Sequence, residues 1–354
     1  MIQADTAIGG SLQLTREKKM TGWKSLLGAA AIAYCAGALA QETTLVLATT
    51  FPPNIHVSAQ MLHPWADRVN EKGKGVLQIV VRDGPTVANF SNFYDRVMSD
   101  VVQIAWGLQS TVAGKFPRSD VVALPFIVDK SEDGAAAFWR LYKTGLLDAE
   151  YDEIVPIMLV ALTPAGVHTS KPLKSLTDLT GTKLIVASKI TGQAVAHMGG
   201  TPLSIPLNDM YEALQRGTAD GAAVAWTSFQ PFKLAEVTFY HVEASLGTSV
   251  GMVFMSKKKY QAMPAAARKV LDAFSGEAES RRFGAFWDRV RDEGRKLALA
   301  SPHKRTIVNL TPADSALWRK KTEPVVDEWA KSTPNGQKIL ATYRKLLADV
   351  KAGK

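Results

Sequence analysis

The sequence predicts an α/β fold in two lobes. At 354 residues, 46% of them hydrophobic, the chain is long enough for two domains and can bury a sizeable core. Apolar, β-branched runs alternate with segments of helical periodicity, which is typical of a largely parallel sheet covered by helices on both faces. The alternation breaks at Pro164-Ala165-Gly166 and begins again, yet no low-complexity linker separates the halves. We therefore expect two lobes joined by more than one crossing strand.

The first half supplies four expected strands with helices between them. The run TTLVLATTF is β-branched and ends at Pro52-Pro53, whereas IHVSAQMLHPWADRVNEKG has helical spacing despite Pro64. In chain order we expect strand 43–51, helix 55–73, strand 75–84, helix 92–100, strand 101–107, helix 132–151 and strand 154–163.

The second half repeats this pattern and ends in helices. One helix has well-marked ends, with Asn208 as the N-cap and Gly217 at the C-terminal stop, and Thr311-Pro312 is typical of another helix start. In chain order we expect strand 183–188, helix 191–199, strand 201–207, helix 209–217, strands 220–226 and 249–256, a long helical region over 265–300 and a last helix over 336–350.

The first forty residues are typical of a secretory signal peptide. Four basic residues precede the apolar segment SLLGAAAIAYCAGALA, which ends in the small-x-small pattern Ala38-Leu39-Ala40. Met20 is a credible start, and cleavage is expected before Gln41. Because the only cysteine, Cys35, lies in this segment, a mature chain would have no disulfide and no thiol chemistry. We expect a soluble, exported, periplasmic protein.

Charge and motifs point away from nucleic acid and from catalysis. Export makes nucleic acid an unexpected partner, and the basic runs fit solvated helix faces. The sequence has no HExxH, Walker A or GxGxxG motif, and its six histidines lack the spacing of metal ligands, so no metal or cofactor is expected. GTSVG (247–251) matches the nucleophile elbow of serine hydrolases, but the residues after Ser249 have strand character instead of helical character. A hydrolase using Ser249 is the alternative to a binding protein.

Several segments in register resemble one transporter family. WADRVNEKGKGVLQIVV, GKFPRSDVVALPF and, most specifically, KPLKSLTDLTGTKL followed by MGGTPLSIPLNDMYEALQRGTADGA match its DLxGxK turn and YxALxxGxxDG segment. Over residues 43 to about 300 the chain resembles the DctP-type substrate-binding subunit of a TRAP (tripartite ATP-independent periplasmic) transporter.

This resemblance implies a two-lobed periplasmic-binding-protein fold that closes on a solute in the cleft, with a long helix buttressing both lobes. It implies lobe I from 41–163 plus 251–290, and lobe II with the C-terminal helices from 164–250 plus 291–354. The implied partners are a small organic solute, by default an organic acid, and the TRAP membrane permease subunits. We expect a monomer that performs no chemistry.

The expected ligand-binding residues combine the resemblance with strand positions. Three aromatic residues fall at carboxyl ends of expected strands, where open α/β sheets bind ligands. Two more residues match the positions of the family's ligand contacts, and His168 follows the break between the lobes. The set is Phe51, Trp106, His168, Ile185, Ser188, Leu207 and Trp226.

Ile185 occupies the position where this family carries an arginine that pairs with a carboxylate. A guanidinium gives a carboxylate a bidentate partner, and a buried carboxylate without one costs several kcal/mol. Either the register is shifted or another base such as Lys189 or Arg82 compensates, or the solute is atypical, namely neutral, cationic or aromatic. The residues leave these alternatives open.

Overall fold

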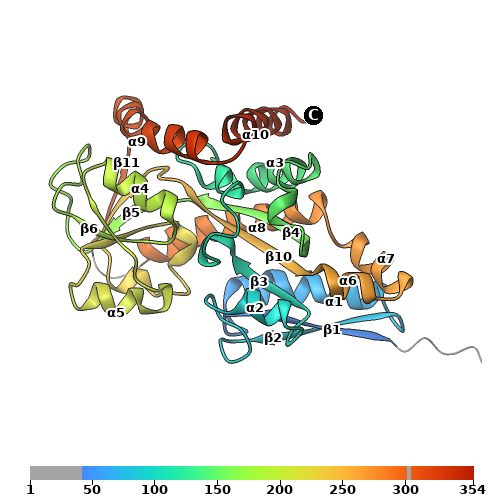
Figure 1. Ribbon diagram of the computed structural model, residues 1–354. Helices are drawn as coiled ribbons and strands as arrows, with labels where there is room; N and C mark the ends of the chain where they lie inside the picture. Colours follow the sequence, from blue (N-terminus) through green and yellow to red (C-terminus); the bar gives the residue numbers. More distant parts are fainter. Residues whose placement is uncertain (1–41, 301–303) are drawn as a thin grey trace, which may run out of the picture. The chain divides into compact units, whose positions relative to one another are not determined.

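The computed structural model describes residues 42–300 and 304–354, so the expected signal peptide and Cys35 lie outside the described residues. Strands and helices alternate along the described chain, as the sequence predicts (Figure 1). Its strands form two sheets, one of five and one of six strands. The α/β class is confirmed.

The first sheet has the strand order β2-β1-β3-β10-β4. Strand β1 pairs in parallel with β2 and β3, whereas β10 runs antiparallel to β3 and β4. The strands are β1 (Thr43–Thr49), β2 (Leu77–Asp83), β3 (Ile104–Leu108), β4 (Ile154–Pro164) and β10 (Thr248–Ser256).

The second sheet has the order β11-β9-β5-β8-β6-β7. The pairs β11–β9, β8–β6 and β6–β7 are parallel, and β5 is antiparallel to both β8 and β9. Among the described strands, only β10 of the first sheet and β5 of the second run against the others, so both sheets are largely parallel, as expected, with one reversed strand each. The strands are β5 (Gly166–Thr169), β6 (Lys183–Val186), β7 (Thr201–Leu203), β8 (Gly221–Val224), β9 (Tyr240–Glu243) and β11 (Thr306–Asn309).

Two adjacent segments among those that carry the chain between the sheets explain the antiparallel pairs. Strand β4 of the first sheet runs through Ala165 directly into β5 of the second, and the chain returns from β9 to β10. The crossings are hydrogen-bonded to each other, because Ala165 N donates to the Gly247 carbonyl at 2.8 Å and Leu246 N donates to the Ala165 carbonyl at 3.1 Å. The break at Pro164-Ala165-Gly166 is thus a crossing point.

The helical region expected over 265–300 is interrupted. It divides at Gly276, whose φ of 101° lies in the left-handed region that favours glycine, so that α7 (Ala265–Ala273) and α8 (Glu277–Leu299) are separate helices. The other helices are a π-helical turn Ser58–Leu62 leading into α1 (His63–Lys72), α2 (Phe93–Met98), α3 (Ser131–Lys143), α4 (Lys189–His197), α5 (Met210–Gln215), α6 (Lys257–Ala262), α9 (Pro312–Ser332) and α10 (Gly336–Lys351).

Helix α8 packs on elements of both sheets. A Cβ atom on Gly284 would clash with the backbone of α3, and one on Gly294 would clash with the Trp226 carbonyl, so both glycines allow close approach of backbones. Asp288 accepts hydrogen bonds from the backbone N–H groups of Ser131 and Glu132 at 3.0 and 3.1 Å, which caps the start of α3. Helix α8 therefore contacts both α3 and the turn after β8 and holds them in place along its length.

The helix start expected at Thr311 is confirmed, whereas the N-cap expected at Asn208 for α5 is wrong. The Thr311 hydroxyl accepts a hydrogen bond from Asp314 N, as expected for an N-cap. Helix α5 instead begins after a 3-10 turn, Leu207–Asp209, so Asp209 and not Asn208 is its N-cap. Asn208 has a side chain suited to an N-cap, but it lies within this 3-10 turn, so the helix begins after it.

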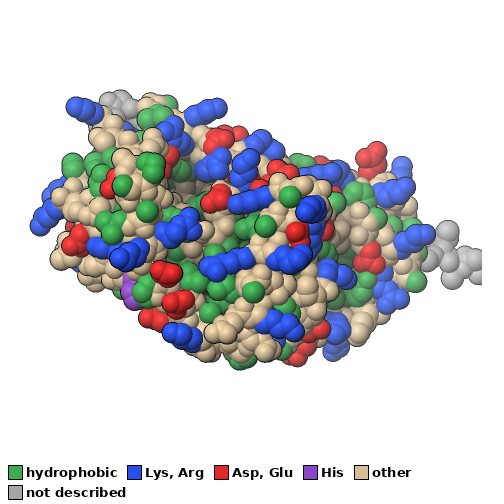
Figure 2. Space-filling model, turned by 90° about the horizontal axis from the view of Figure 1, so that it is seen from above, with side chains coloured by type: hydrophobic (Ala, Val, Ile, Leu, Met, Phe, Trp, Pro, Cys, Tyr) green, Lys and Arg blue, Asp and Glu red, His purple; other side chains and the backbone are tan. Residues whose placement is uncertain are grey.

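Charged side chains are spread over the face shown in Figure 2. Lys and Arg are frequent there, with Asp and Glu between them, which fits a solvated face of mixed charge. Over residues 42–300 and 304–354, the structure contains no helix long and apolar enough to cross a membrane.

Candidate functional site

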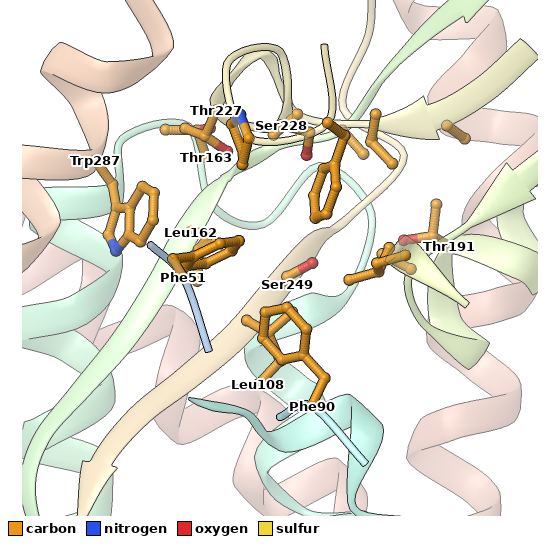
Figure 3. A pocket seen from close by; sticks show the side chains of 18 of the residues that line it. Phe51, Phe90, Leu108, Leu162, Thr163, Thr191, Thr227, Ser228, Ser249 and Trp287 are labelled. Atoms are coloured by element: carbon orange, nitrogen blue, oxygen red, sulfur yellow. The ribbon is translucent and has the colours of Figure 1, made fainter. Parts of the chain in front are cut away.

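A small internal cavity lies where the two sheets meet, and the side chains around it come from both (Figure 3). Phe51 follows β1 and Leu108 ends β3, whereas Ala187 and Ala225 follow β6 and β8 of the second sheet. Both sheets thus contribute the carboxyl ends of parallel strands, the usual ligand-binding edge of open α/β sheets. The cavity volume is about 50 Å³.

Aromatic rings form much of the cavity wall. The Phe51 ring packs edge-on against Phe90, with centroids 5.5 Å apart, and lies 6.2 Å from Phe232, which follows the 3-10 turn Trp226–Ser228. On the other side, the indoles of Trp106 and Trp287 have their centroids 5.9 Å apart. Because these rings come from five separate segments, the wall depends on the fold and not on one motif.

Hydroxyl groups are the main polar feature of the cavity. Figure 3 shows the hydroxyls of Ser228 and Ser249 pointing toward its open centre. Neither hydroxyl has a hydrogen-bond partner among the described residues. The Thr191 hydroxyl also lines the cavity but is already bonded to the Ser188 hydroxyl at 3.0 Å. None of the described residues that line the cavity is Lys, Arg, Asp or Glu.

Four buried polar atoms of cavity-lining residues lack partners. These are His56 Nδ1, Trp106 Nε1, Thr163 Oγ1 and Trp287 Nε1, each without a hydrogen bond within residues 42–300 and 304–354. Buried polar atoms are nearly always paired, and each unpaired one has a free-energy cost. Four of the described polar atoms without partners thus belong to residues that line this one cavity.

His56 links the segment before α1 to the turn after β8 at the edge of the cavity. Its Nε2 lies 3.2 Å from the Thr227 carbonyl, so Nε2 carries the proton and Nδ1 is an acceptor in the neutral ring. Burial lowers the pKa of His56 to about 4, although the hydrogen bond to the Thr227 carbonyl opposes this shift. His56 is therefore neutral at pH 7 and adds no charge to the wall.

A wider groove adjoins the cavity and shares Ala187 and Leu207 with it. The groove has a volume of about 600 Å³ and is lined by the start of α4, including Ser188 and Lys189. Ser188 is the N-cap of α4, and its hydroxyl accepts a hydrogen bond from Thr191 N at 3.1 Å. The groove is thus one of the openings that border the cavity.

The structure brings three of the residues expected from sequence to the cavity itself. Phe51, Trp106 and Leu207 line it, and Ser188 lines the adjoining groove. Ile185, by contrast, is fully buried and belongs to a core cluster with Met210 of α5. Its neighbours on β6, Leu184 and Val186, belong to a different core cluster, because successive side chains of a strand alternate between faces.

His168 and Trp226 lie in a packed cluster inside the second sheet. This histidine–aromatic cluster consists of His168, Trp226, Phe229 and His241, with ring centroids 4.5 to 5.6 Å apart. His168 Nε2 lies 3.1 Å from the Val224 carbonyl, and its Nδ1 lies 3.1 Å from Nδ1 of His241. Neither His168 nor Trp226 lines the cavity, although Trp226 borders a separate pocket beside His56.

Sequence reasoning missed several cavity residues. Phe90 and Phe232 stand in loops, where a large aromatic side chain is itself a signal of binding that could have been used. Ser249 was noticed only as a nucleophile. It lies in β10, with no turn into a helix after it, so the structure does not support the hydrolase alternative.

Comparison with known families identifies the chain. Residues 48–332 match the profile of the DctP family, described as bacterial extracellular solute-binding protein, family 7. Among curated proteins, the chain is 22% identical over 317 residues to the outer membrane transporter protein TsaT of Comamonas testosteroni, which covers 86% of this chain and 92% of that protein.

Two solved structures have the same fold over nearly their whole length. A TRAP solute-binding protein from Rhodoferax ferrireducens T118 in complex with copurified benzoate is 29% identical, with a TM-score of 0.82 and coverage of 88% of this chain and 100% of that one. A marine metagenome TRAP solute-binding protein in complex with 3-hydroxybenzoate is 25% identical, with a TM-score of 0.82 and coverage of 87% and 99%. These relatives are two-lobed solute receptors and not enzymes. This chain belongs to the DctP family, the family 7 bacterial extracellular solute-binding proteins, and is a solute-binding protein of the TRAP type.

Proposed function

We propose that this TRAP-type protein captures a small monocyclic aromatic acid in the cavity. The observation that carries the proposal is the wall of Phe51, Phe90, Phe232 and Trp106 around an uncharged interior. Aromatic rings prefer edge-on or offset contacts with other rings, which this wall offers from several directions. The benzoate and 3-hydroxybenzoate complexes of similar proteins support the same class of solute.

The cavity must widen to accept a ring. A dry cavity of about 150 Å³ is needed to take up benzene, whereas this one measures about 50 Å³. The contact between Phe51 and Phe232 joins the two sides of the cavity, so the lobes have to separate before a ring enters from the groove. We infer hinge opening about the crossings at Ala165 and Gly247, followed by closure on the solute.

A ligand screen tests the proposed function. Benzoate and 3-hydroxybenzoate are expected to raise the unfolding temperature of the purified protein, because a ligand that binds only the folded state stabilises it. Succinate and glutamate, which lack a ring and carry two carboxylates, are expected to leave the temperature unchanged. Isothermal titration then gives the affinity. A response to succinate without a response to any aromatic acid would contradict the proposal.

The finer biological setting is also proposed. TRAP solute-binding proteins work with a membrane permease, and we propose that this chain reaches the periplasm through cleavage before Gln41. N-terminal sequencing of the protein from a periplasmic extract tests the cleavage site. We also propose lobe I as 41–163 plus 251–290, lobe II as 164–250 plus 291–354, and a monomer. Light scattering at several concentrations tests the monomer.

A further inference from the structure

We propose that the acid group of the solute is held by the hydroxyl groups of Ser228 and Ser249, without a cationic side chain. This inference rests on the proposed function, because it concerns how the same cavity anchors an aromatic acid. It replaces the sequence argument from the missing arginine at Ile185. The Ile185 side chain is buried in the core and does not line the cavity, so it does not indicate how a carboxylate is held there.

The cations near the site do not reach the cavity. None of the described lining residues is charged, and Arg82, on β2, is not among them. Lys189 lines the groove instead, and it lies close enough to Asp120 to lower the pKa of that carboxyl, against the larger raising effect of burial. Lys189 thus has an acidic neighbour of its own outside the cavity.

Ser228 and Ser249 approach the cavity from different segments. Ser228 ends the 3-10 turn after β8, and Ser249 lies at the start of β10, next to the crossing between the sheets. Both hydroxyls point toward the open centre, and neither is bonded within the described residues (Figure 3). Two free O–H donors that converge from separate segments can each donate to one carboxylate group.

The strength of hydrogen bonds between hydroxyl groups and a carboxylate favours such an anchor. An O–H group that donates to a carboxylate forms a short hydrogen bond, roughly twice as strong as one between neutral groups. The low dielectric of an enclosed, aromatic-lined cavity strengthens it further. Hydrogen bonds to the ionised form also hold a carboxylate in that form against the cost of burial. A neutral anchor should discriminate an acid from its amide less strongly than a guanidinium does.

The test uses the full chain with matched variants. The affinities of wild type, Ser228→Ala, Ser249→Ala and the double variant for benzoate and for benzamide are measured by titration calorimetry. Each single change is expected to weaken benzoate binding about 10- to 100-fold, the range for a hydrogen bond to a charged group. Ser99→Ala is the matched control, because that exposed hydroxyl lines neither the cavity nor the groove. Lys189→Gln is the control for a cation, and both controls are expected to stay within about threefold of wild type.

The possible outcomes separate the two proposals. If wild type binds benzoate and the serine variants bind it equally well, or if Lys189→Gln alone abolishes binding, the hydroxyl anchor is wrong and the aromatic cavity stands. If wild type binds no aromatic acid, both proposals fail. Loss of benzoate binding in the serine variants, with unchanged unfolding temperatures without ligand, supports the anchor. Binding that changes little with ionic strength supports it as well, because a partly exposed cation would be screened.

Discussion

The aromatic residues around the cavity and those of the histidine–aromatic cluster have similar composition and differ in packing. In the cluster, Trp226 and Phe229 contact both histidines at ring distances of 4.5 to 5.6 Å, and Phe229, His168 and His241 are fully buried. Around the cavity, Phe51 and Phe232 are only partly buried and leave space between them.

The difference follows from where the segments come together. The cluster residues all belong to the second sheet and the turns beside it, so one folded unit packs them to the density of a core. The cavity residues are contributed by both sheets and by α8. Aromatic residues thus leave a cavity where segments of both sheets come together, and they form core where segments of the second sheet pack on each other.

Ile185→Arg should have the largest effect of any change considered. The side chain at this position is fully enclosed among Met210, Leu214 and Ala222, so an arginine would bury a charge without a partner. We expect a loss of more than about 4 kcal/mol in the free energy of unfolding, or failure to fold. Urea unfolding measures it, with Ile185→Val as the control, expected to cost about 0.5–1.5 kcal/mol. A stable arginine variant that binds benzoate more tightly would return Ile185 to the cavity.

Trp226→Ala tests whether the cluster is core. Removing a large buried aromatic side chain costs about 3–5 kcal/mol through lost transfer free energy and the remaining void. Trp226 is 6% exposed and contacts three other rings, so we expect a value in this range from urea unfolding. A small loss of stability accompanied by a large loss of benzoate affinity would show that Trp226 belongs to the binding site.

The two histidines of the cluster should make stability depend on pH. Burial is the main cause that lowers the pKa of His241 to about 4, and the charge of Arg305 lowers the pKa of His241 further. Burial also lowers the pKa of His168 well below its usual value. The unfolded chain therefore binds protons below pH 6.5 while the folded chain does not. Each histidine should remove about 1.4 kcal/mol of stability per pH unit as the pH falls from 6.5 toward 4.

Other groups act in the opposite direction, so the measurement has to be a difference. Burial raises the pKa of Asp120 to about 7, which favours the folded state as the pH falls below that value. Urea unfolding of wild type and His241→Leu should therefore be compared at pH 7.5, 6 and 5. The variant is expected to lose less stability between pH 6 and 5 than wild type does. Equal slopes would mean that His241 is protonated in the fold.

The sequence predicted the order of most strands and helices, because hydrophobic periodicity and turn residues are local. It missed β5, β9 and β11, which are only four residues long and depend on partners distant in the chain. The rule of strand ends predicted Phe51, Trp106 and Trp226 as site residues; Phe51 and Trp106 line the cavity, whereas the Trp226 ring packs in the core. The direction in which a side chain points depends on how its segment packs in the fold, and a local sequence pattern does not contain that information.

The motif around Ser249 gives the opposite case, in which the sequence singles out the residue but suggests a role that the structure does not support. Its residues matched a catalytic turn, and the structure gives the same hydroxyl a place at the cavity, in β10 beside a register shift between Thr248 and Val250. The GxSxG pattern singles out Ser249 because a nucleophile elbow exposes its serine hydroxyl. The role could not be assigned, because the aromatic wall that defines the role comes from loops around Phe90 and Phe232.

Phe232→Leu should have the smallest effect on stability and a clear effect on binding. The Phe232 side chain is partly buried, and its contact with Phe51 at 6.2 Å is a single edge-on pair of the kind worth about 0.5–1.5 kcal/mol. We expect the free energy of unfolding to fall by less than about 1 kcal/mol, while benzoate affinity falls about 3- to 10-fold because the solute ring loses one aromatic partner. Phe229→Leu in the cluster is the matched control: it should lower stability more and leave affinity nearly unchanged, because Phe229 is fully buried and contacts three rings. If both variants lost stability alike and neither changed affinity, the cavity wall would be ordinary core, and the difference between the two aromatic groups would disappear.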